Sequence, residues 1–322
     1  MPLIHKSSYP GAPFYQFTPH LQTILPALIR KVKGVNYKRE RFTLSDGDFV
    51  DLDWIDKKSK TLALLVHGLE GSTDRHYMKG MAKHFAQKNW DVLAWNCRSC
   101  SGEMNLKRRL YHHGEIGDIE EVIQHAISLN NYEKIVLIGF SMGGNIIMKY
   151  LGVHGENIPA PVYKAVVFSA PLDLVSSVLL LDLPESSFYK KRFLKLLKTK
   201  IEIKAEKYPE YIDFQNFSKI EKWADFDNFF TAPLNGFKDA TEFYHQGSAV
   251  NFMEGIKTPT LLVNAQNDPI LTPECSPTAL CESHKYIYLE TPREGGHVGF
   301  MASGISGAWS EGRAWEFVNQ GG

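Results

Sequence analysis

The sequence lacks a long apolar run, a net charge and a dense set of cysteines. No hydrophobic stretch approaches ~18 consecutive residues, so we expect no membrane-spanning helix. The 36 Lys and Arg residues balance 36 Asp and Glu residues, which disfavours a nucleic-acid binder because such proteins carry a basic field. Four cysteines among 322 residues are too few for a disulfide scaffold. Since residues 1–18 also lack the apolar region of a signal peptide, we expect a soluble, cytoplasmic protein.

The remaining composition favours a large globular fold. Hydrophobic residues make up 43% of the chain, enough for one large core or two small ones. Short apolar runs alternate with helix-like stretches, the pattern of an α/β fold with a mostly parallel twisted sheet. The expected buried strands are residues 61–66, 91–95, 134–138, 165–168, 260–263 and 286–289, preceded by a hairpin of 41–44 and 49–54. The expected helices are residues 77–88, 116–129, 142–150 and 307–318.

One stretch breaks this alternation. Residues 174–250 are aromatic, charged and helix-like and contain no β-rich run. We therefore expect a single domain over residues 1–322, with a helical insertion at about 175–250 that covers the carboxyl edge of the sheet as a lid. No repeat or low-complexity linker suggests a further division of the chain.

A short motif follows one of the expected buried strands. Gly139-Phe140-Ser141-Met142-Gly143 is a G-x-S-x-G pattern with a strand directly before it and a helix directly after it, the context of a nucleophile elbow. That sharp turn holds the serine in strained backbone, and small flanking residues avoid clashes. We expect Ser141 to be a nucleophile. The alternative is a glycine-rich turn with an incidental serine.

A serine hydroxyl needs a base to take its proton and an acid to orient that base. In this architecture the chain order is Ser, then Asp or Glu, then His, each after a strand. Asp268 and His297 each follow an expected buried strand, and Gly295-Gly296 gives His297 a tight loop. We therefore expect His297 as general base and then general acid, and Asp268 as the orienting acid. Asp173, which follows an earlier strand, is the alternative acid.

Negative charge that develops on a carbonyl oxygen needs fixed N–H donors. One expected donor is the backbone N–H of Met142, directly after the nucleophile. The second should come from the loop after the strand 61–66, where the sequence reads His67-Gly68-Leu69-Glu70-Gly71. We expect the Leu69 N–H to be that donor and His67 to brace the loop by hydrogen bonding.

Six parts of the chain agree in order and content with one known family. They are residues 19–23, 67–72, 139–145, 226–237, 264–269 and 295–300. Together they resemble the YheT-like α/β-hydrolases, candidate esterases related to eukaryotic abhydrolase-domain lipid hydrolases and yeast medium-chain alcohol acyltransferases. One departure is Ser99, which replaces a glycine of the family's loop; if that loop needs a positive φ, Ser99 carries a conformational cost. The resemblance implies an α/β-hydrolase fold and hydrolysis of carboxylic esters with short or medium acyl chains.

Two weaker patterns carry less information. Cys97 and Cys100 form a C-x-x-C pair, but zinc would need two further ligands at suitable spacing, and the other two cysteines offer no matching pair. His113 and Asp118 fit an H-x₄-D acyltransferase-like pattern, although Asp118 is better explained as an acid near the positive end of a helix dipole. We therefore expect no metal and no cofactor.

Residues 188–207 are strongly basic. They include eight Lys and Arg residues and two Glu residues, a local charge of +6, and Leu194, Leu197 and Ile201 form a stripe at helical spacing. The stretch is either an amphipathic lid helix with a solvated basic face or a site of transient contact with an anionic lipid surface. Further aromatic residues either line an acyl pocket or pack the lid: Trp223, Phe226, Phe229, Phe230 and Tyr244.

The sequence therefore predicts a serine esterase that acts on a small-molecule acyl ester through an acyl-enzyme on Ser141. An alcohol acyltransferase would use the same three residues, with an alcohol in place of water as the acyl acceptor. A non-catalytic scaffold that keeps the fold is a third reading. Water exclusion decides between the first two, and sequence alone does not report it, nor does it report the oligomeric state.

Overall fold

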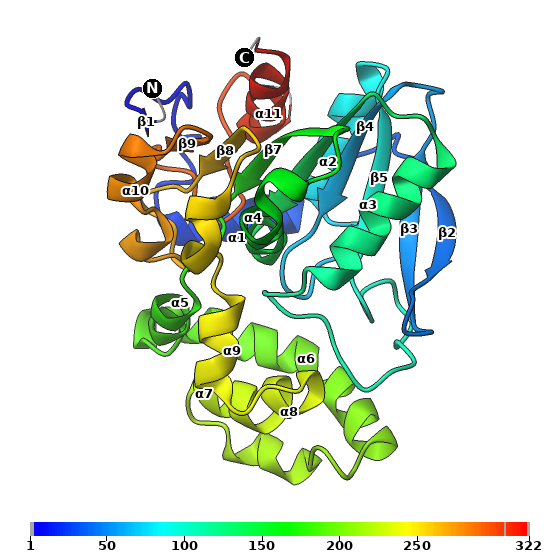
Figure 1. The fold of residues 1–322 in the computed structure, drawn as a ribbon. Coiled ribbons are helices and arrows are strands. Elements are labelled where there is room, and N and C mark those ends of the chain that lie inside the picture. Colours follow the sequence, from blue (N-terminus) through cyan, green and yellow to red (C-terminus); the bar gives the residue numbers. More distant parts are fainter. Residues whose placement is uncertain (1–2, 306, 321–322) are drawn as a thin grey trace.

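The protein is built around one nine-stranded sheet (Figure 1). The computed structural model describes residues 3–305 and 307–320. The strands lie in the order β1-β9-β8-β7-β6-β4-β5-β3-β2. They are β1 (Leu3–Ile4), β2 (Lys38–Thr43), β3 (Phe49–Ile55), β4 (Thr61–Val66), β5 (Asp91–Asn96), β6 (Lys134–Phe140), β7 (Val162–Phe168), β8 (Thr260–Val263) and β9 (Ile287–Glu290).

Most of this sheet is parallel. Strand β4 pairs in parallel with β5 and β6, and the parallel pairing continues through β7, β8 and β9 to β1. Only β2 and β3 are antiparallel to their neighbours, which confirms the predicted opening hairpin. The predicted α/β-hydrolase architecture is confirmed, although the two-residue edge strand β1 was not expected.

Helices cover both faces of the sheet, so its central strands are buried on both sides. On one face, Leu62 and Leu64 of β4 belong to an apolar cluster with residues of α3 and α4. On the other face, Ala63 and Leu65 belong to a cluster with residues of α2 and α11, as the two-residue period of a strand requires. The helices outside the region between β7 and β8 are α1 (Pro19–Ile29), α2 (His76–Gln87), α3 (Gly117–Leu129), α4 (Met142–His154), α10 (Thr278–Ser283) and α11 (Trp309–Asn319).

Between β7 and β8 the chain leaves the sheet and forms five further α-helices, seen below the sheet in Figure 1. We call this part the helical segment: α5 (Leu174–Leu181), α6 (Ser187–Lys207), α7 (Trp223–Phe226), α8 (Ala232–Asn235) and α9 (Ala240–Gly247). It has an apolar cluster of its own, which includes Leu197, Ile201, Phe226 and Phe230. No helix within residues 3–305 and 307–320 is long and apolar enough to cross a membrane.

Candidate active site

Ser141 occupies the turn between β6 and α4, where it has φ 53° and ψ −122°. A non-glycine residue rarely adopts a positive φ, and such strain clusters at functional sites. The neighbouring glycines make the turn possible, because a Cβ at Gly143 would collide with the carbonyl oxygens of Val66 and His67. A Cβ at Gly139 would likewise collide with the backbone of Gly143. The G-x-S-x-G pattern thus lets the serine stand at the end of a buried strand.

Ser141, His297 and Asp268 lie in one hydrogen-bonded chain. The Oγ of Ser141 lies 2.8 Å from His297 Nε2, and His297 Nδ1 lies 2.9 and 3.1 Å from the two carboxylate oxygens of Asp268. Because a carboxylate only accepts, the His297 proton is on Nδ1 and Nε2 is free to accept from the serine hydroxyl. The Asp268 side chain is fully buried, and the N–H of Ile270 also donates to it at 2.9 Å.

The alternative acid, Asp173, has a different role in the fold. It is the N-cap of α5, and its carboxylate accepts a hydrogen bond of 2.8 Å from the N–H of Ser176. This is the ordinary function of an aspartate at a helix start. Its side chain makes no hydrogen bond with His297 in the described part of the chain, whereas Asp268 contacts that imidazole through both oxygens.

The loop after β4 lies directly against the nucleophile. A Cβ on Gly68 would be 2.9 Å from the Ser141 Cβ, so only glycine allows this approach. The next residue, Leu69, lines both cavities that reach Ser141. Within the described residues neither the Leu69 N–H nor the N–H of Met142, the first residue of α4, has a protein acceptor. Two backbone donors beside Ser141 are therefore free to bind an oxygen.

His67 braces this loop, as predicted. Its Nδ1 lies 2.8 Å from the Gly68 carbonyl oxygen, and its Nε2 accepts a hydrogen bond of 3.1 Å from the Cys97 N–H. Burial lowers the pKa of His67 to about 4, so the ring is neutral and one nitrogen donates while the other accepts. Both ring nitrogens are thus used to hold the loop.

A second brace reaches the same loop from the helical segment. Glu70, which has φ 51°, accepts a hydrogen bond of 2.6 Å from the Lys200 ammonium of α6. The Tyr111 hydroxyl also donates to the Glu70 carboxylate and accepts from the Glu70 N–H at 3.1 Å. Neither contact was predicted, because the partners lie 130 and 41 positions from Glu70 in the sequence.

Helix α1 holds the histidine loop, a role that the sequence analysis missed. The Thr23 hydroxyl accepts from the His297 N–H at 2.9 Å. The Gln22 carbonyl oxygen Oε1 accepts from the Gly295 N–H at 3.0 Å and from the Asn267 amide at 2.9 Å. Gln22 is buried and thus joins the acid loop to the base loop. The only sequence signal was the family-like stretch 19–23.

Two cavities meet at Ser141. The first, called the inner cavity, has a volume of about 900 Å³ and is lined mostly by apolar side chains of the helical segment. The second, called the outer cavity, is about 1700 Å³ and opens between α1, α6 and the loop after β4. Both cavities are lined by Leu69, Ser141, Phe193, Ile270 and His297. A bound molecule could therefore extend in two directions from the serine.

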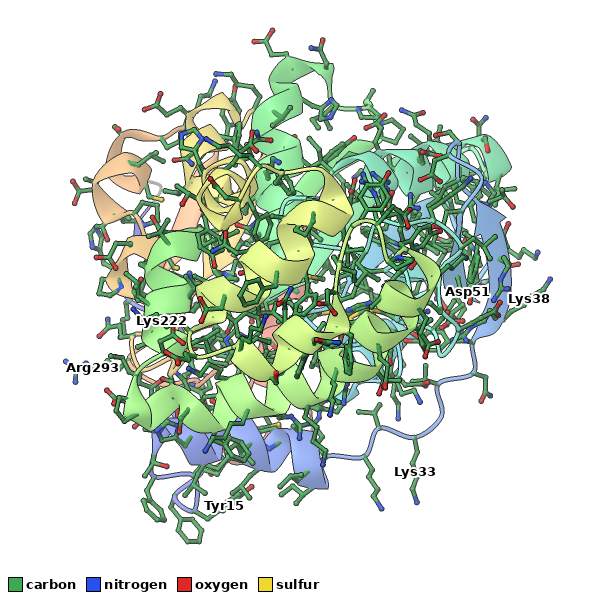
Figure 2. All side chains as sticks on the ribbon, turned by 90° about the horizontal axis from the view of Figure 1, so that it is seen from below. Tyr15, Lys33, Lys38, Asp51, Lys222 and Arg293 are labelled. Carbon is green, nitrogen blue, oxygen red and sulfur yellow. The ribbon has the colours of Figure 1, made fainter. Side chains whose placement is uncertain are left out.

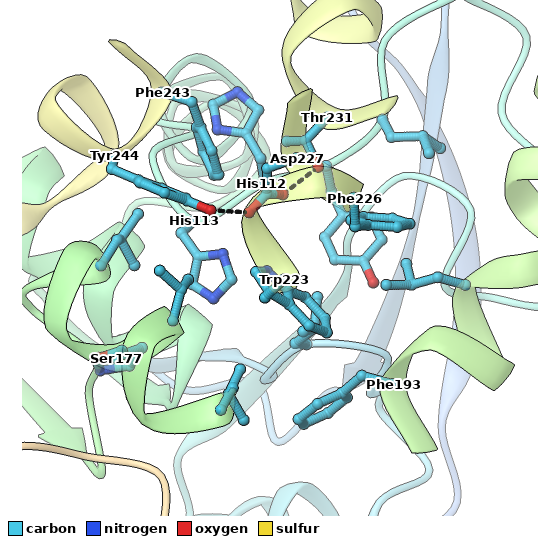
Figure 3. A pocket seen from close by; sticks show the side chains of 18 of the residues that line it. His112, His113, Ser177, Phe193, Trp223, Phe226, Asp227, Thr231, Phe243 and Tyr244 are labelled. Carbon is cyan, nitrogen blue, oxygen red and sulfur yellow. Dashed lines mark hydrogen bonds between the residues drawn. The ribbon is translucent and has the colours of Figure 1, made fainter. Parts of the chain in front are cut away.

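Some of the aromatic residues of residues 223–244 line the inner cavity, and others only pack within the helical segment. Trp223, Phe226 and Tyr244 line the inner cavity (Figure 3). Phe230 does not line it and is fully buried in the cluster of the helical segment. Phe229 packs against that cluster from its edge.

Asp118 of the H-x₄-D pattern and the two cysteines of the C-x-x-C pattern are buried in structural environments. Asp118 lies in the first turn of α3, as predicted for an early-helix acid. It also accepts hydrogen bonds of 2.7 and 2.8 Å from the buried Arg98, which the sequence did not predict. Cys97 and Cys100 are buried free thiols. Burial raises the pKa of both, that of Cys100 to about 11, which disfavours the reactive thiolate.

Comparisons with known proteins agree with this geometry. A family model described as the alpha/beta hydrolase fold matches residues 64–302. The candidate esterase YheT of Escherichia coli is 32% identical over 290 residues, which cover 88% of this chain and 84% of YheT. The chain belongs to the YheT-like α/β hydrolases. Phospholipase ABHD3 of Mus musculus is 25% identical over 93% of this chain and 74% of its own length.

The chain is also similar to a further relative and to a solved structure. The medium-chain fatty acid ethyl ester synthase/esterase 2 of Saccharomyces cerevisiae is 24% identical over 80% of this chain and 61% of its own length. Among solved structures, the Pyrococcus furiosus esterase Pf2001 superposes with a TM-score of 0.60 at 17% identity and covers 98% of both chains. At this identity the structural match speaks for the fold alone.

Proposed function

We propose that the protein is a serine hydrolase that cleaves carboxylic esters with short or medium acyl chains. The observation that carries the proposal is the hydrogen-bonded chain from Asp268 through His297 to the Ser141 hydroxyl. It lies beside the free N–H groups of Leu69 and Met142. Nucleophile, base, orienting acid and oxyanion donors thus form the arrangement that ester hydrolysis requires.

The first step forms an acyl-enzyme. His297 Nε2 takes the hydroxyl proton while Ser141 Oγ attacks the ester carbonyl carbon. The Leu69 and Met142 N–H groups donate to the resulting oxyanion. His297 then gives its proton to the alkoxide oxygen, and the alcohol leaves. Asp268 keeps the imidazole in the required tautomer and stabilises its cationic form.

The second step releases the acid. His297 takes a proton from water, and the resulting hydroxide attacks the acyl carbon. The tetrahedral intermediate collapses, the Ser141 oxygen leaves, and it receives the proton from His297. The products are a carboxylic acid and the free enzyme, so the cycle consumes one ester and one water.

The two cavities suggest where the parts of the substrate bind. The inner cavity has a mostly apolar wall that reaches Ser141, which suits an acyl chain. The wider outer cavity, with Arg75, Lys79 and Arg192 among its lining residues, suits the alcohol part and its exit. In this proposal the helical segment acts as a lid over the inner cavity.

The relatives support the same reaction class. Their names describe a candidate esterase, a phospholipase and an ester synthase/esterase. Two of these names refer to esters directly, which supports ester hydrolysis as the reaction class proposed for this chain. The natural substrate of this chain is a narrower question than its reaction class.

A direct test is labelling with a serine-reactive phosphonate together with turnover of p-nitrophenyl esters of increasing chain length. We expect the wild-type protein to be labelled and the Ser141→Ala variant to remain unlabelled. Hydrolysis should fall by at least ~10⁴-fold in the variant, with an unchanged circular dichroism spectrum. Wild-type protein that neither reacts with the phosphonate nor cleaves any ester would support the non-catalytic scaffold instead.

An alcohol acyltransferase is the second candidate. The yeast relative is named as both a synthase and an esterase of ethyl esters, and the mostly apolar lining of the inner cavity would disfavour water near the acyl-enzyme. Product analysis with and without added ethanol separates the two. Ethyl ester that exceeds free acid at low alcohol concentration would favour the transferase.

We also propose transient contact with an anionic lipid surface, but through a different face from the one the sequence suggested. Leu197 and Ile201 of α6 are buried and line the inner cavity, so the predicted stripe points inward. Phe14 and Phe17, which precede α1, are instead 89% and 79% exposed.

Helices α1 and α6 lie side by side near these two phenylalanines, joined by a hydrogen bond of 2.9 Å between His20 and Tyr189. Figure 2 shows this side of the molecule, with Tyr15 and Lys33 projecting from it. Exposed apolar side chains flanked by cations are the features that bind an anionic lipid interface. Further exposed apolar and cationic residues beside α1 and α6 line the outer cavity: Leu28, Lys31, Phe188 and Arg192.

A further inference from the structure

The lining of the inner cavity includes polar residues that the apolar-chain assignment does not use. The Asn235 Oδ1 is buried and has no hydrogen-bond partner within the described residues, although Asn235 lines the cavity. The amide orientation is fixed by its other end, because Nδ2 donates to the Thr231 carbonyl oxygen at 2.9 Å. A buried acceptor without a partner costs free energy, so a ligand donor that reached this oxygen would lower that cost.

His113 presents a second polar surface to the same cavity. Figure 3 shows its ring projecting into the space between Tyr244 and Trp223. The Asn145 side chain of α4 donates a hydrogen bond of 2.8 Å to the His113 backbone carbonyl oxygen. Neither ring nitrogen has a protein partner in the described part of the chain. Because Asn145 lies one helical turn after Ser141, this bond holds His113 near the nucleophile.

The charge state of these groups limits the kind of ligand. Burial lowers the pKa of His113 to about 3, so its ring is neutral and offers one N–H donor and one acceptor. Asp227 lines the same cavity, but its two oxygens already accept from Tyr244 at 2.7 Å and Thr231 at 2.6 Å. Its carboxyl group would repel a carboxylate on a ligand. A neutral hydroxyl, which donates and accepts, matches both His113 and Asn235.

We propose that the inner cavity binds acyl chains that carry a hydroxyl group, with the His113 imidazole and the Asn235 Oδ1 as hydrogen-bond partners. This rests on the proposed ester hydrolysis and narrows its substrate class. A plain alkyl chain would leave both groups without partners inside a mostly apolar wall. A hydroxylated chain pairs at least one of them, and sites built for a hydroxyl discriminate against analogues that lack it.

The test compares p-nitrophenyl octanoate with its 3-hydroxy and 8-hydroxy derivatives. We expect at least one hydroxylated ester to have a kcat/KM roughly tenfold above that of the plain ester, the effect of about one hydrogen bond. His113→Phe keeps a flat ring without nitrogens, and Asn235→Leu keeps the size without the acceptor. At least one of these variants should abolish the preference while still cleaving the plain ester.

A shape control separates polarity from packing. Val178→Ile changes the volume of the inner cavity but adds no polar atom, so it should change the rates of all three esters in parallel. The inference is wrong if the wild-type protein prefers the plain ester over both hydroxylated ones, or if the preference survives in both polar variants.

Binding to Ser141→Ala keeps the inference testable without catalysis. Calorimetry should show that methyl 3-hydroxyoctanoate or methyl 8-hydroxyoctanoate binds roughly tenfold more tightly than methyl octanoate, about the effect of one hydrogen bond. If no ester is cleaved but this binding difference is present, the proposed reaction fails and the hydroxyl site stands. If esters are cleaved and the three ligands bind equally, only the hydroxyl site fails.

Discussion

Lys200 donates a hydrogen bond of 2.6 Å to the Glu70 carboxylate and thereby joins α6 to the loop that carries the Leu69 N–H. Both side chains are mostly buried, with 16% and 6% exposed. The position of a proposed oxyanion donor is therefore tied to the position of a helix in the proposed lid. Movement of α6 away from the sheet would leave a buried carboxylate with only the Tyr111 hydroxyl as a side-chain partner.

Replacement of Lys200 with Met should test this link. The variant keeps the length of the side chain but removes the charge, so we expect a loss of about 2 kcal/mol in unfolding free energy. We also expect a roughly tenfold fall in kcat, because a displaced oxyanion donor acts on the transition state. Urea unfolding and ester kinetics measure the two effects. The exposed Lys198 on the same helix gives the matched control, and Lys198→Met should change stability by less than about 0.5 kcal/mol.

The hydroxyl of Thr23 should act as a positioning group for His297. Thr23→Val keeps the shape but leaves the His297 N–H without its acceptor. We expect kcat to fall roughly tenfold with little change in KM, because a small misplacement of the base affects the reacting geometry more than substrate binding. Thr23→Ser retains the hydroxyl and should stay close to wild type. Equal effects of both substitutions would mean that Thr23 only packs the helix.

The buried His67 should make the fold sensitive to acid. Burial lowers its pKa from 6.5 to about 4 in the folded state, so the unfolded chain binds this proton at higher pH than the folded chain. The stability that neutral His67 contributes is complete above pH 6.5 and is lost as the pH falls to 4, by about 3 kcal/mol.

Urea unfolding between pH 4 and pH 8 measures this dependence. His67→Gln removes the titrating group, so the variant should be less stable at pH 7 but show a flatter decline below pH 6.5. An identical slope for the variant and the wild type would assign the acid sensitivity to other buried groups.

The exposed phenylalanines before α1 should govern binding to lipid vesicles. Phe14→Ser with Phe17→Ser should weaken sedimentation with anionic vesicles by at least about tenfold, since burial of one Phe side chain contributes about 1.5–3 kcal/mol. Added salt should weaken the wild-type interaction as well. Leu129→Ser on α3 removes another exposed apolar side chain, 54% exposed, and serves as the control. Unchanged vesicle binding in the double variant would exclude this face.

The sequence pattern predicted the strands that carry the site with few errors. Strands β4 and β8 begin and end where predicted, because each is a short, mostly apolar run that the sheet buries on both faces. The predicted helix ends differ from the observed ends by one to several residues. Helix α4, for example, continues to His154, whereas the prediction ended at Tyr150. Ser99 does have a positive φ of 62°, and its hydroxyl offsets part of the cost by donating to the Asn105 side chain at 2.6 Å.

What the sequence did not predict are contacts between elements far apart in the chain. Gln22 and Gly295 are separated by 273 positions, and no local pattern relates a buried glutamine in one helix to the N–H of a distant loop. Local patterns likewise identified α6 as amphipathic but left open whether it is a lid helix with a solvated basic face or a lipid-contact site, and the burial of Leu197 and Ile201 favours the lid helix. The direction of that stripe depends on what the helix packs against, which only the tertiary structure specifies.

The hydrogen bonds between α1 and the histidine loop also have a consequence for shortened forms of this protein. Gln22 and Thr23 lie outside residues 64–302, the part that matches the shared family pattern. A fragment trimmed to that pattern would still contain serine, histidine and aspartate, yet it would lack the hydrogen-bond acceptors that fix the histidine backbone. Residues 64–302 alone would thus lack part of the structure that positions the proposed base.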